Sequence, residues 1–455
     1  MSSWQLYRPN DSAPWNTMRV VHLHRRAGFA ATWNEIQRDV MDGPDAAITR
    51  LLQGRSYSNG VPADFEQMAA VIGDAAIGSN NPNRLKAWWI YRFLFSPDPL
   101  TEKLTLLWHD HFATSNLKIN DLSMMRRQNE ILRANARAPF RQLLGAVVHD
   151  PAMLVWLDAD SNRKGSPNEN LARELMELFT IGIGNYTEHD VKEAARALTG
   201  WSVRRNAYFE NPEVHDDGEK TILGQTGRWR GDNLLGILLD HSATARRLAW
   251  RICNLLMGEQ VVDDAGLDEL AEGLREHDLD IGWTVETVLR SQAFFSESNI
   301  AARVASPLEF AIGAVRALEC FDPPPSTLLL AEWAARMGQD LFYPPNVGGW
   351  SGGRDWLAGR YVVARANFAA QLAEGKLWSP VSEWDVSEVV ERSGGQSSDP
   401  ADVIDTLAQL LLVTRLPEAS RSSILASVEQ KKGTSHDRIR WAAATLLSLP
   451  DAQFV

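Results

Sequence analysis

The chain has 455 residues, of which 44% are apolar and 23% are charged, and its formal charge is −12. This composition is typical of a folded globular protein and excludes a disordered or fibrous chain. The acidic balance argues against nucleic acid or an anionic membrane as the main partner. The sequence has no run of 18 uncharged apolar residues, which excludes a membrane-spanning helix.

The N-terminal segment MSSWQLYRPNDSAPW lacks a basic start, an apolar stretch and a twin-arginine pair. It therefore does not resemble a secretion signal, and we expect a cytoplasmic protein. The two cysteines, Cys253 and Cys320, are far apart in apolar helical stretches. They are expected to be buried free thiols, because two distant cysteines provide neither a disulfide framework nor a cysteine-based zinc site.

Apolar residues recur at three- and four-residue spacing along most of the chain, as in Leu85, Trp88, Trp89 and Phe93. This periodicity predicts helices, and alternating patterns typical of strands are scarce. The main exception is segment 203–223, which we expect to form a long loop or a small hairpin. The predicted fold class is therefore all-α, with one large multi-helix domain.

Pro99 and Thr101 mark the start of a predicted helix that leads into His109-Asp110-His111. If the helix ends there and the chain extends, His109 and His111 can bind one divalent transition metal such as Zn, Fe or Mn. Inside a helix the two rings would instead point to nearly opposite faces. The alternative is a buried, hydrogen-bonded histidine beside an exposed one.

A second helix is predicted from Ser166, which forms a capping-box pattern with Glu169 and is followed by Pro167. On this helix Asn170, Glu174 and Glu177 share one side, opposite the apolar arc. Carboxylates one turn apart can bind a cation or share general acid and base work. Arg173 lies in a stripe at four-residue spacing that suits ion pairs. The alternative is a solvated, salt-bridged helix face.

Thr187 and Asp190 resemble a cap pair at the start of the next helix. Further along, His215-Asp216-Asp217 and Lys220 form a second polar cluster within the irregular segment. This cluster is a candidate for substrate binding, because it can add a ligand or close over a site. The alternative is an exposed loop with local turns.

Segment 343–353 is too rich in Pro and Gly to be helical. Its residues 349–353 match the G-x-S-x-G pattern of serine hydrolases, but that pattern requires a preceding strand and a following helix, which are not predicted here. Trp350 and Trp356 are candidates for stacking on a sugar or another flat ligand. Segment 394–400 is predicted to be a linker between a main domain, 1–393, and a C-terminal helical segment, 401–455.

Several segments together resemble a bacterial family known as domain of unknown function 1800. The matching segments are 22–29, 108–112, 168–182, 186–201, 215–220, 306–310 and 345–350. Ala30 and Ser351 depart from the residues usual in the family, Gly and Pro. The resemblance implies a helical protein without an established reaction, often encoded beside an exported family, number 1501, that resembles sulfatases and alkaline phosphatases.

Three functions follow as hypotheses. The first is a metal-dependent hydrolase or oxidase, in which His109 and His111 bind the metal, Glu174 and Glu177 act as catalytic groups, Asn170 orients a ligand or water, and Arg173 holds the carboxylates or an anionic substrate. The second is a non-catalytic helical partner or maturation protein for the neighbouring sulfatase-like product. The third is a carbohydrate-binding protein that uses Trp350 and Trp356.

Overall fold

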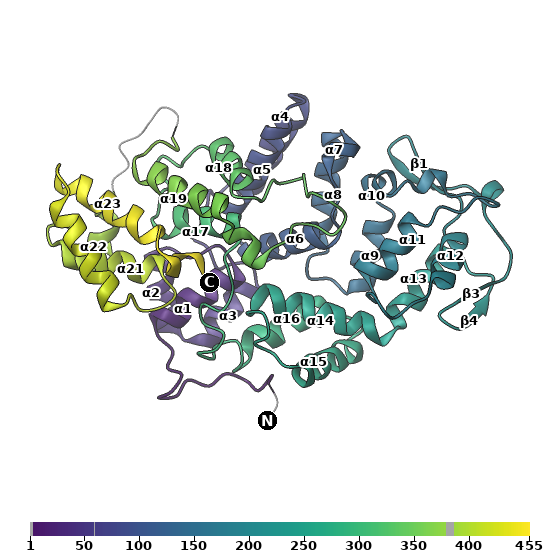
Figure 1. Ribbon diagram of the computed structural model, residues 1–455, viewed down its shortest axis with the longest axis horizontal. Coiled ribbons are helices and arrows are strands. Elements are labelled where there is room, and N and C mark those ends of the chain that lie inside the picture. Colours follow the sequence, from purple (N-terminus) through teal and green to yellow (C-terminus); the bar gives the residue numbers. More distant parts are fainter. Residues whose placement is uncertain (1–2, 59, 379–385) are drawn as a thin grey trace.

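The computed structural model describes residues 3–58, 60–378 and 386–455 (Figure 1). This part of the chain contains 23 α-helices and two small two-stranded sheets, which confirms the all-α prediction. None of the described helices is long and apolar enough to cross a membrane.

The N-terminal helices connect through short turns and begin at caps that the sequence provides, such as the Thr32/Glu35 capping box of the second helix. They are α1 (Thr17–Ala27), α2 (Trp33–Asp42), α3 (Pro44–Leu52), α4 (Phe65–Gly78), α5 (Pro82–Phe95), α6 (Pro99–His111), α7 (Asn116–Ile119), α8 (Leu122–Ala134), α9 (Phe140–Val148) and α10 (Pro151–Trp156).

The middle of the chain holds the two hairpins and a π-helical turn. Its elements are α11 (Asn170–Glu174), the π-helical turn η2 (Leu175–Phe179), α12 (Glu188–Ala197), β1 (Trp201–Arg204), β2 (Ala207–Glu210), β3 (Lys220–Ile222), β4 (Gln225–Gly227), α13 (Gly231–Asp240), α14 (Ser242–Leu256), α15 (Asp264–Glu276) and α16 (Ile281–Arg290). Both hairpins are antiparallel, and Trp201 lies opposite Glu210 in the first.

The described part of the C-terminal third is mainly helical, with a Gly- and Pro-rich loop before its third element. It comprises α17 (Pro307–Ala317), α18 (Thr327–Arg336), the 3₁₀ turn η4 (Gly353–Leu357), α19 (Gly359–Ala373), α20 (Ser387–Arg392), α21 (Pro400–Leu411), α22 (Glu418–Gln430) and α23 (Ser435–Leu447).

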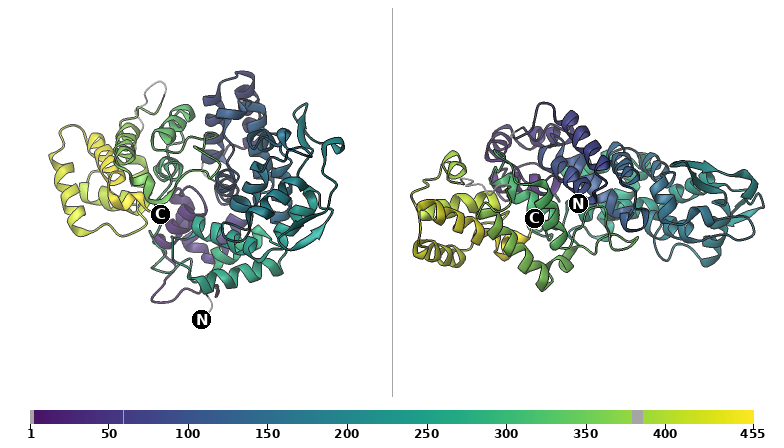
Figure 2. Two further views of the ribbon diagram at one scale, coloured as in Figure 1. Left: turned by 45° about the vertical axis from the view of Figure 1, so that its right-hand side comes forward. Right: turned by 90° about the horizontal axis from the view of Figure 1, so that it is seen from above.

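Two large hydrophobic clusters form the core. The first core joins α9 to α16, and the second joins α5, α17 to α19 and α21 to α23. Helix α6 contributes to both, with Leu104 and Trp108 in the first core and Leu106 in the second. The hairpins and α21–α23 lie at opposite ends of the long axis, with α6 and α17 between them (Figures 1 and 2).

Helix α6 is buried on almost every side, so its polar side chains need partners within the protein. Pro99 occupies its first turn, as the sequence predicts, and Asp98 caps the helix by accepting a hydrogen bond from the backbone N–H of Thr101. The carboxylate of Glu102 is bound by the guanidinium groups of Arg92 and Arg133. This ion pairing joins α6 to α5 and α8.

The capping box of Thr187 and Asp190 is confirmed at the start of α12. The predicted helix start at Ser166 is wrong, because α11 begins only at Asn170 and has no side-chain cap. Ser166 instead closes a turn with Arg163, and Asn162 accepts a hydrogen bond from the backbone N–H of Asn168. These contacts hold the chain before α11 in a non-helical path.

The C-terminal helices pack on the main body of the protein. Helix α23 contacts α19, and α21 contacts both α1 and α17. Segment 394–400 connects α20 and α21 as a turn that ends at the cap Asp399. The boundaries of the domains and of the linker stay predictions.

Asp150 caps α10 and is 2% exposed. Its Oδ1 accepts hydrogen bonds from Gln128 Nε2 and from the backbone N–H of Ala152, whereas its Oδ2 has no partner among the described residues. Burial raises the pKa of this carboxyl group to about 6, because the charged form loses its hydration. Ionisation of Asp150 in the folded protein therefore lowers the free energy of unfolding.

We expect Asp150→Asn to stabilise the protein at about pH 8 and to have little effect at about pH 4, since asparagine can keep the cap without carrying a charge. A raised carboxyl pKa means that the wild type loses stability as the pH rises through the interval from the unfolded to the folded pKa. The expected gain has an upper limit of about 3 kcal/mol. Chemical denaturation across this pH range measures it.

Asp121→Asn, at the less buried cap of α8, is the matched control, and its effect should change less with pH. A stability difference between Asp150→Asn and the wild type that stays constant with pH contradicts the interpretation.

Candidate functional site

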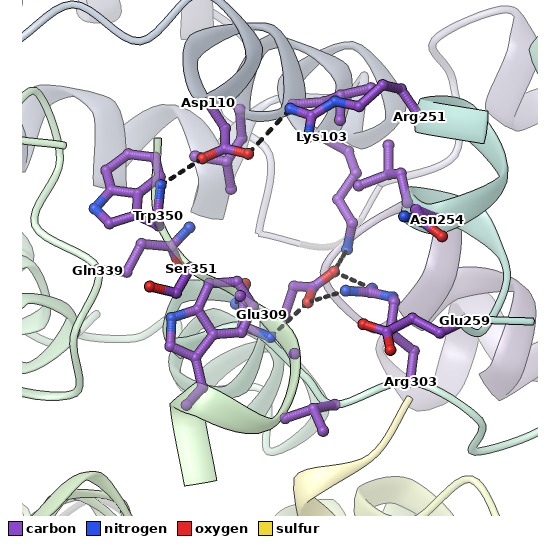
Figure 3. Close-up of a pocket in the computed structure, with 18 of the residues that line it drawn as sticks. Lys103, Asp110, Arg251, Asn254, Glu259, Arg303, Glu309, Gln339, Trp350 and Ser351 are labelled. Atoms are coloured by element: carbon purple, nitrogen blue, oxygen red, sulfur yellow. Dashed lines mark hydrogen bonds and ion pairs between the residues drawn. The ribbon is translucent and has the colours of Figure 1, made fainter. Parts of the chain in front are cut away.

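A cavity of about 530 Å³ lies where the two cores meet (Figure 3). Its walls come from α6, from α14 and the turn that follows it, from the segment that leads into α17, and from the Gly-rich loop. The lining residues are Lys103, Leu106, Leu107, Asp110, Trp250, Arg251, Asn254, Leu255, Glu259, Gln260, Arg303, Val304, Ser306, Glu309, Gln339, Trp350, Ser351, Gly352, Gly353 and Trp356.

Lys103, Arg303 and Glu309 form a buried charged cluster in the cavity wall (Figure 3). Glu309 is in the first turn of α17, where it completes a capping box with Ser306. Its carboxylate forms an ion pair with Lys103 and binds Arg303 through both oxygens. Lys103 Nζ also donates to the backbone oxygens of Arg25 at 3.1 Å and Gly28 at 2.7 Å.

The pKa values of Lys103 and Glu309 are both lowered, but for different physical reasons. Burial lowers the pKa of Lys103 to about 8, although the carboxylate of Glu309 opposes this effect. The pKa of Glu309 lies well below its usual range, because Arg303 and Lys103 outweigh the burial of the carboxylate. The wall therefore contains an ionised acid beside an amine that can lose its proton in a mildly basic solution.

Asp110 lies at the last turn of α6 and joins three elements. Its Oδ2 accepts a hydrogen bond from Arg251 Nη2 at 3.1 Å, and its Oδ1 accepts one from the backbone N–H of Trp350 at 2.8 Å. Burial raises the pKa of this carboxyl group, and Arg251 opposes the rise. Asp110 therefore attaches the Gly-rich loop to α6 and α14.

Gly349 allows the loop to approach α6 this closely. Its φ of +84° lies in the left-handed region, and a Cβ atom there would lie 2.6 Å from the backbone oxygen of Asp110. Glycine is therefore required here for both conformation and space.

Three tryptophans face the cavity from different elements. Trp250 of α14 is 41% exposed, Trp356 of η4 is partly exposed, and Trp350 is buried. The predicted pair Trp350 and Trp356 thus lies in one cavity with Trp250, whose apolar helical spacing in the sequence instead predicts a core residue. Neutral polar groups, including Asn254 and Ser351, line the same space (Figure 3).

The two predicted metal-binding histidines do not face a common point. Helix α6 ends only after His111, so both histidines are still helical and their rings lie on different sides of the helix. The His109 ring contacts Trp89, Phe342 and Trp350, and burial lowers its pKa to about 3.

The His111 ring lies on the other side of α6, among Phe140 and Phe179. Its Nε2 pairs with the backbone oxygen of Phe179 at 3.2 Å. Burial lowers its pKa well below the usual value, with further lowering by Arg251 and Arg247. Both histidines are therefore neutral core side chains. The alternative in which one of them is exposed is wrong as well, because both are buried.

The four predicted catalytic residues lie on α11 and η2, outside the cavity lining, and are Asn170, Arg173, Glu174 and Glu177. Glu177 accepts a hydrogen bond from the Tyr186 hydroxyl at 2.7 Å, and burial together with Glu177 raises the pKa of Glu174. The other two members make surface contacts: Arg173 forms ion pairs with Glu169 and Glu188, and Asn170 donates to Asp158.

Among the described residues, no three His, Cys, Asp or Glu side chains form a group that could hold a metal ion. The expected ligand set of His109 and His111 with the acidic pair is therefore not assembled in this structure. The transition metal itself stays a prediction.

His215 and Lys220 form a self-contained structure beside the end of α12. His215 Nδ1 pairs with the backbone oxygen of Thr199 at 2.8 Å. Lys220 Nζ donates to the backbone oxygens of Asp216 at 2.5 Å and Gly218 at 2.8 Å. Both side chains are buried, unlike the exposed loop considered as the alternative, and neither lines the cavity.

Most of the charged residues of the cavity have no distinctive pattern in the sequence. Asp110 stands between two histidines, and Glu309 lies within a segment that resembles the family. Arg251, Arg303 and Lys103 are single charges inside apolar helical or loop patterns. The one available signal was Ser306 followed by Glu309, which is a capping-box pattern and carries no indication of a cavity.

Comparison with protein families gives one match, to a family described as a protein of unknown function (DUF1800), over residues 22–454. Searches of curated proteins and of solved structures gave no match.

We expect Gly349→Ala to lower the melting temperature by the equivalent of about 1 to 3 kcal/mol, because the new Cβ meets the backbone of Asp110 in a strained conformation. Thermal unfolding measures the change. Gly359→Ala is the matched control, since a Cβ there meets no atom within 4 Å and the residue starts a helix. Equal melting temperatures for the two variants would show that the loop is not constrained by Asp110.

Proposed function

Because the chain belongs to the DUF1800 family, whose description states no activity, we propose from the cavity that this protein binds saccharides. The observation that carries the proposal is the convergence of Trp250, Trp350 and Trp356 on one polar cavity. Sugar rings have apolar C–H faces and a polar hydroxyl edge, so they suit aromatic faces surrounded by hydrogen-bonding groups.

The size and construction of the cavity support this proposal. Its volume of about 530 Å³ is within the range of small-molecule sites. Trp350 is held by its backbone hydrogen bond to Asp110 and by the His109 ring, whose centroid lies 5.7 Å from that of its own ring. A ring held in place before binding loses little conformational entropy when a ligand arrives.

Polar groups at the rim supply the hydrogen bonds that sugar hydroxyls need. Glu259, on the turn after α14, is exposed and makes no ion pair within the described part of the chain. Asn254 and Ser351 add neutral donors and acceptors. These groups differ from Asp110 and Glu309, whose oxygens already accept hydrogen bonds from the protein.

A metal-dependent hydrolase or oxidase, a sulfatase-like partner and a cytoplasmic location stay predictions.

We expect Trp356→Ala and Trp250→Ala each to weaken saccharide binding by about tenfold or more, on the order of 1.4 kcal/mol, because each removes an aromatic face. A glycan array identifies ligands, and isothermal titration calorimetry measures their affinities. These two tryptophans are preferred to Trp350, whose burial makes it part of the core.

Trp441→Ala is the matched control, since Trp441 is a 40% exposed tryptophan on α23 that does not line the cavity. An array on which neither neutral nor charged oligosaccharides bind the wild type refutes the proposal. Equal loss of binding in the Trp441 variant refutes it as well.

A further inference from the structure

Further positively charged side chains are buried behind the charged cluster of the cavity wall. Three arginines lie behind it: Arg25 and Arg26 on α1, and Arg365 on α19. They are 6%, 0% and 1% exposed, respectively. Glu309 raises the pKa of each of them, as it does for Lys103, whereas Arg303 lowers the pKa of Arg26 and of Lys103.

These three arginines are bound to backbone and amide oxygens. Arg25 donates to the backbone oxygen of Leu411 at 2.7 Å, and Arg26 donates to that of Asn299 at 2.9 Å. Arg365 donates to the backbone oxygen of Ala305 at 2.7 Å and to Gln453 Oε1 at 3.2 Å. Within the described part of the chain, none of the three forms an ion pair with a side-chain carboxylate.

Five cationic side chains therefore surround the single carboxylate of Glu309. The cavity lining is formally balanced, because Lys103, Arg251 and Arg303 face Asp110, Glu259 and Glu309. The three arginines behind the lining make the region positive in a chain whose formal charge is −12. The N-terminus of α17, at Ser306 in the lining, adds the positive end of a helix dipole.

Burial without an acidic partner raises the free energy of the charged form of a side chain. This effect lowers the pKa values of the three arginines. Burial lowers the pKa of Arg25 and of Arg365 to about 10, and that of Arg26 well below its usual value. Buried Nε atoms of Arg26 and Arg303 have no hydrogen-bond partner among the described residues. These buried cations would attract an anion in the cavity, because the low-dielectric protein between them and the cavity screens their charge only weakly.

We infer that the saccharide bound in this cavity is anionic, and that its acidic substituent lies against the wall formed by Lys103, Arg303 and Glu309. The inference rests on the proposed saccharide binding and names the ligand class. The tryptophans contact the sugar rings, and the buried cations favour a carboxylate or sulfate substituent on one of them.

Lys103 provides an internal reporter of an anion at this wall. The charged groups that face it are Glu309 of α17, Arg303 before α17 and Arg26 of α1, and the Phe29 ring lies 4.9 Å from Nζ. With a pKa of about 8, its amine is partly deprotonated in mildly basic solution. A bound anion raises that pKa, so binding takes up protons and weakens as the pH rises.

The test compares trigalacturonic acid with its fully methyl-esterified form, which has the same rings without the charges. We expect the acid to bind the full-length wild type at least about tenfold more tightly, and added salt to reduce the difference. Calorimetry in buffers of different ionisation enthalpy should detect net proton uptake at about pH 8 for the acid alone. A sulfated galactose trimer, run in parallel, shows whether a sulfate is preferred to a carboxylate.

The variant Lys103→Gln keeps a donor for the backbone oxygens and removes the titrating charge. We expect it to lose the proton uptake and to reduce the ratio of the affinities for the acid and for the ester. If this buried substitution prevents folding, as circular dichroism would show, the matched ligands and the proton uptake still test the inference on the wild type.

Equal or tighter binding of the methyl ester and of neutral oligosaccharides overturns the inference but leaves saccharide binding intact. Tight binding of the acid without proton uptake and without salt dependence also overturns it. Absence of binding by every saccharide refutes the proposed function as well, so the two failures are distinguishable.

Discussion

The fold depends on an ammonium group that is buried between its two cores. Helix α6 belongs to both cores, and its Lys103 is 1% exposed. The carboxylate of Glu309 on α17 and the backbone oxygens of Arg25 and Gly28 bind this group. Removing the carboxylate would leave an uncompensated buried charge, at a cost of about 3 to 5 kcal/mol. The ion pair thus joins α1, α6 and α17 at the centre of the molecule.

The cavity follows from the same arrangement. Its charged wall is the ion pair itself, and its opposite wall is the Gly-rich loop that Asp110 holds against α6. Arg251 of α14 binds the other oxygen of Asp110, so one carboxylate orients elements that are 141 and 240 residues away in the chain. A site built on such packed elements keeps its aromatic rings in position before a ligand binds.

Polar residues that the sequence grouped together have separate roles in the structure. His109 and His111 are two residues apart on one helix, and each is enclosed by aromatic rings of a different region. The carboxylate of Glu177 is bound by Tyr186 beside the π-helical turn, away from the cavity lining. Residues that are close in the sequence therefore suggested a shared site. In the structure, the geometry of the helix directs their side chains to different regions.

Local patterns in the sequence determined the helical class, the start of α6 at Pro99 and the capping box at Thr187, because caps and periodicity act over three or four residues. They also indicated a non-helical loop at Trp350, whereas Trp356 lies in the 3₁₀ turn η4. Only the tertiary structure decided that Lys103 meets Glu309 and that five cations surround one acid. Such contacts join residues that are far apart in the chain, 206 positions for Lys103 and Glu309, and depend on how complete helices pack, which no local pattern encodes.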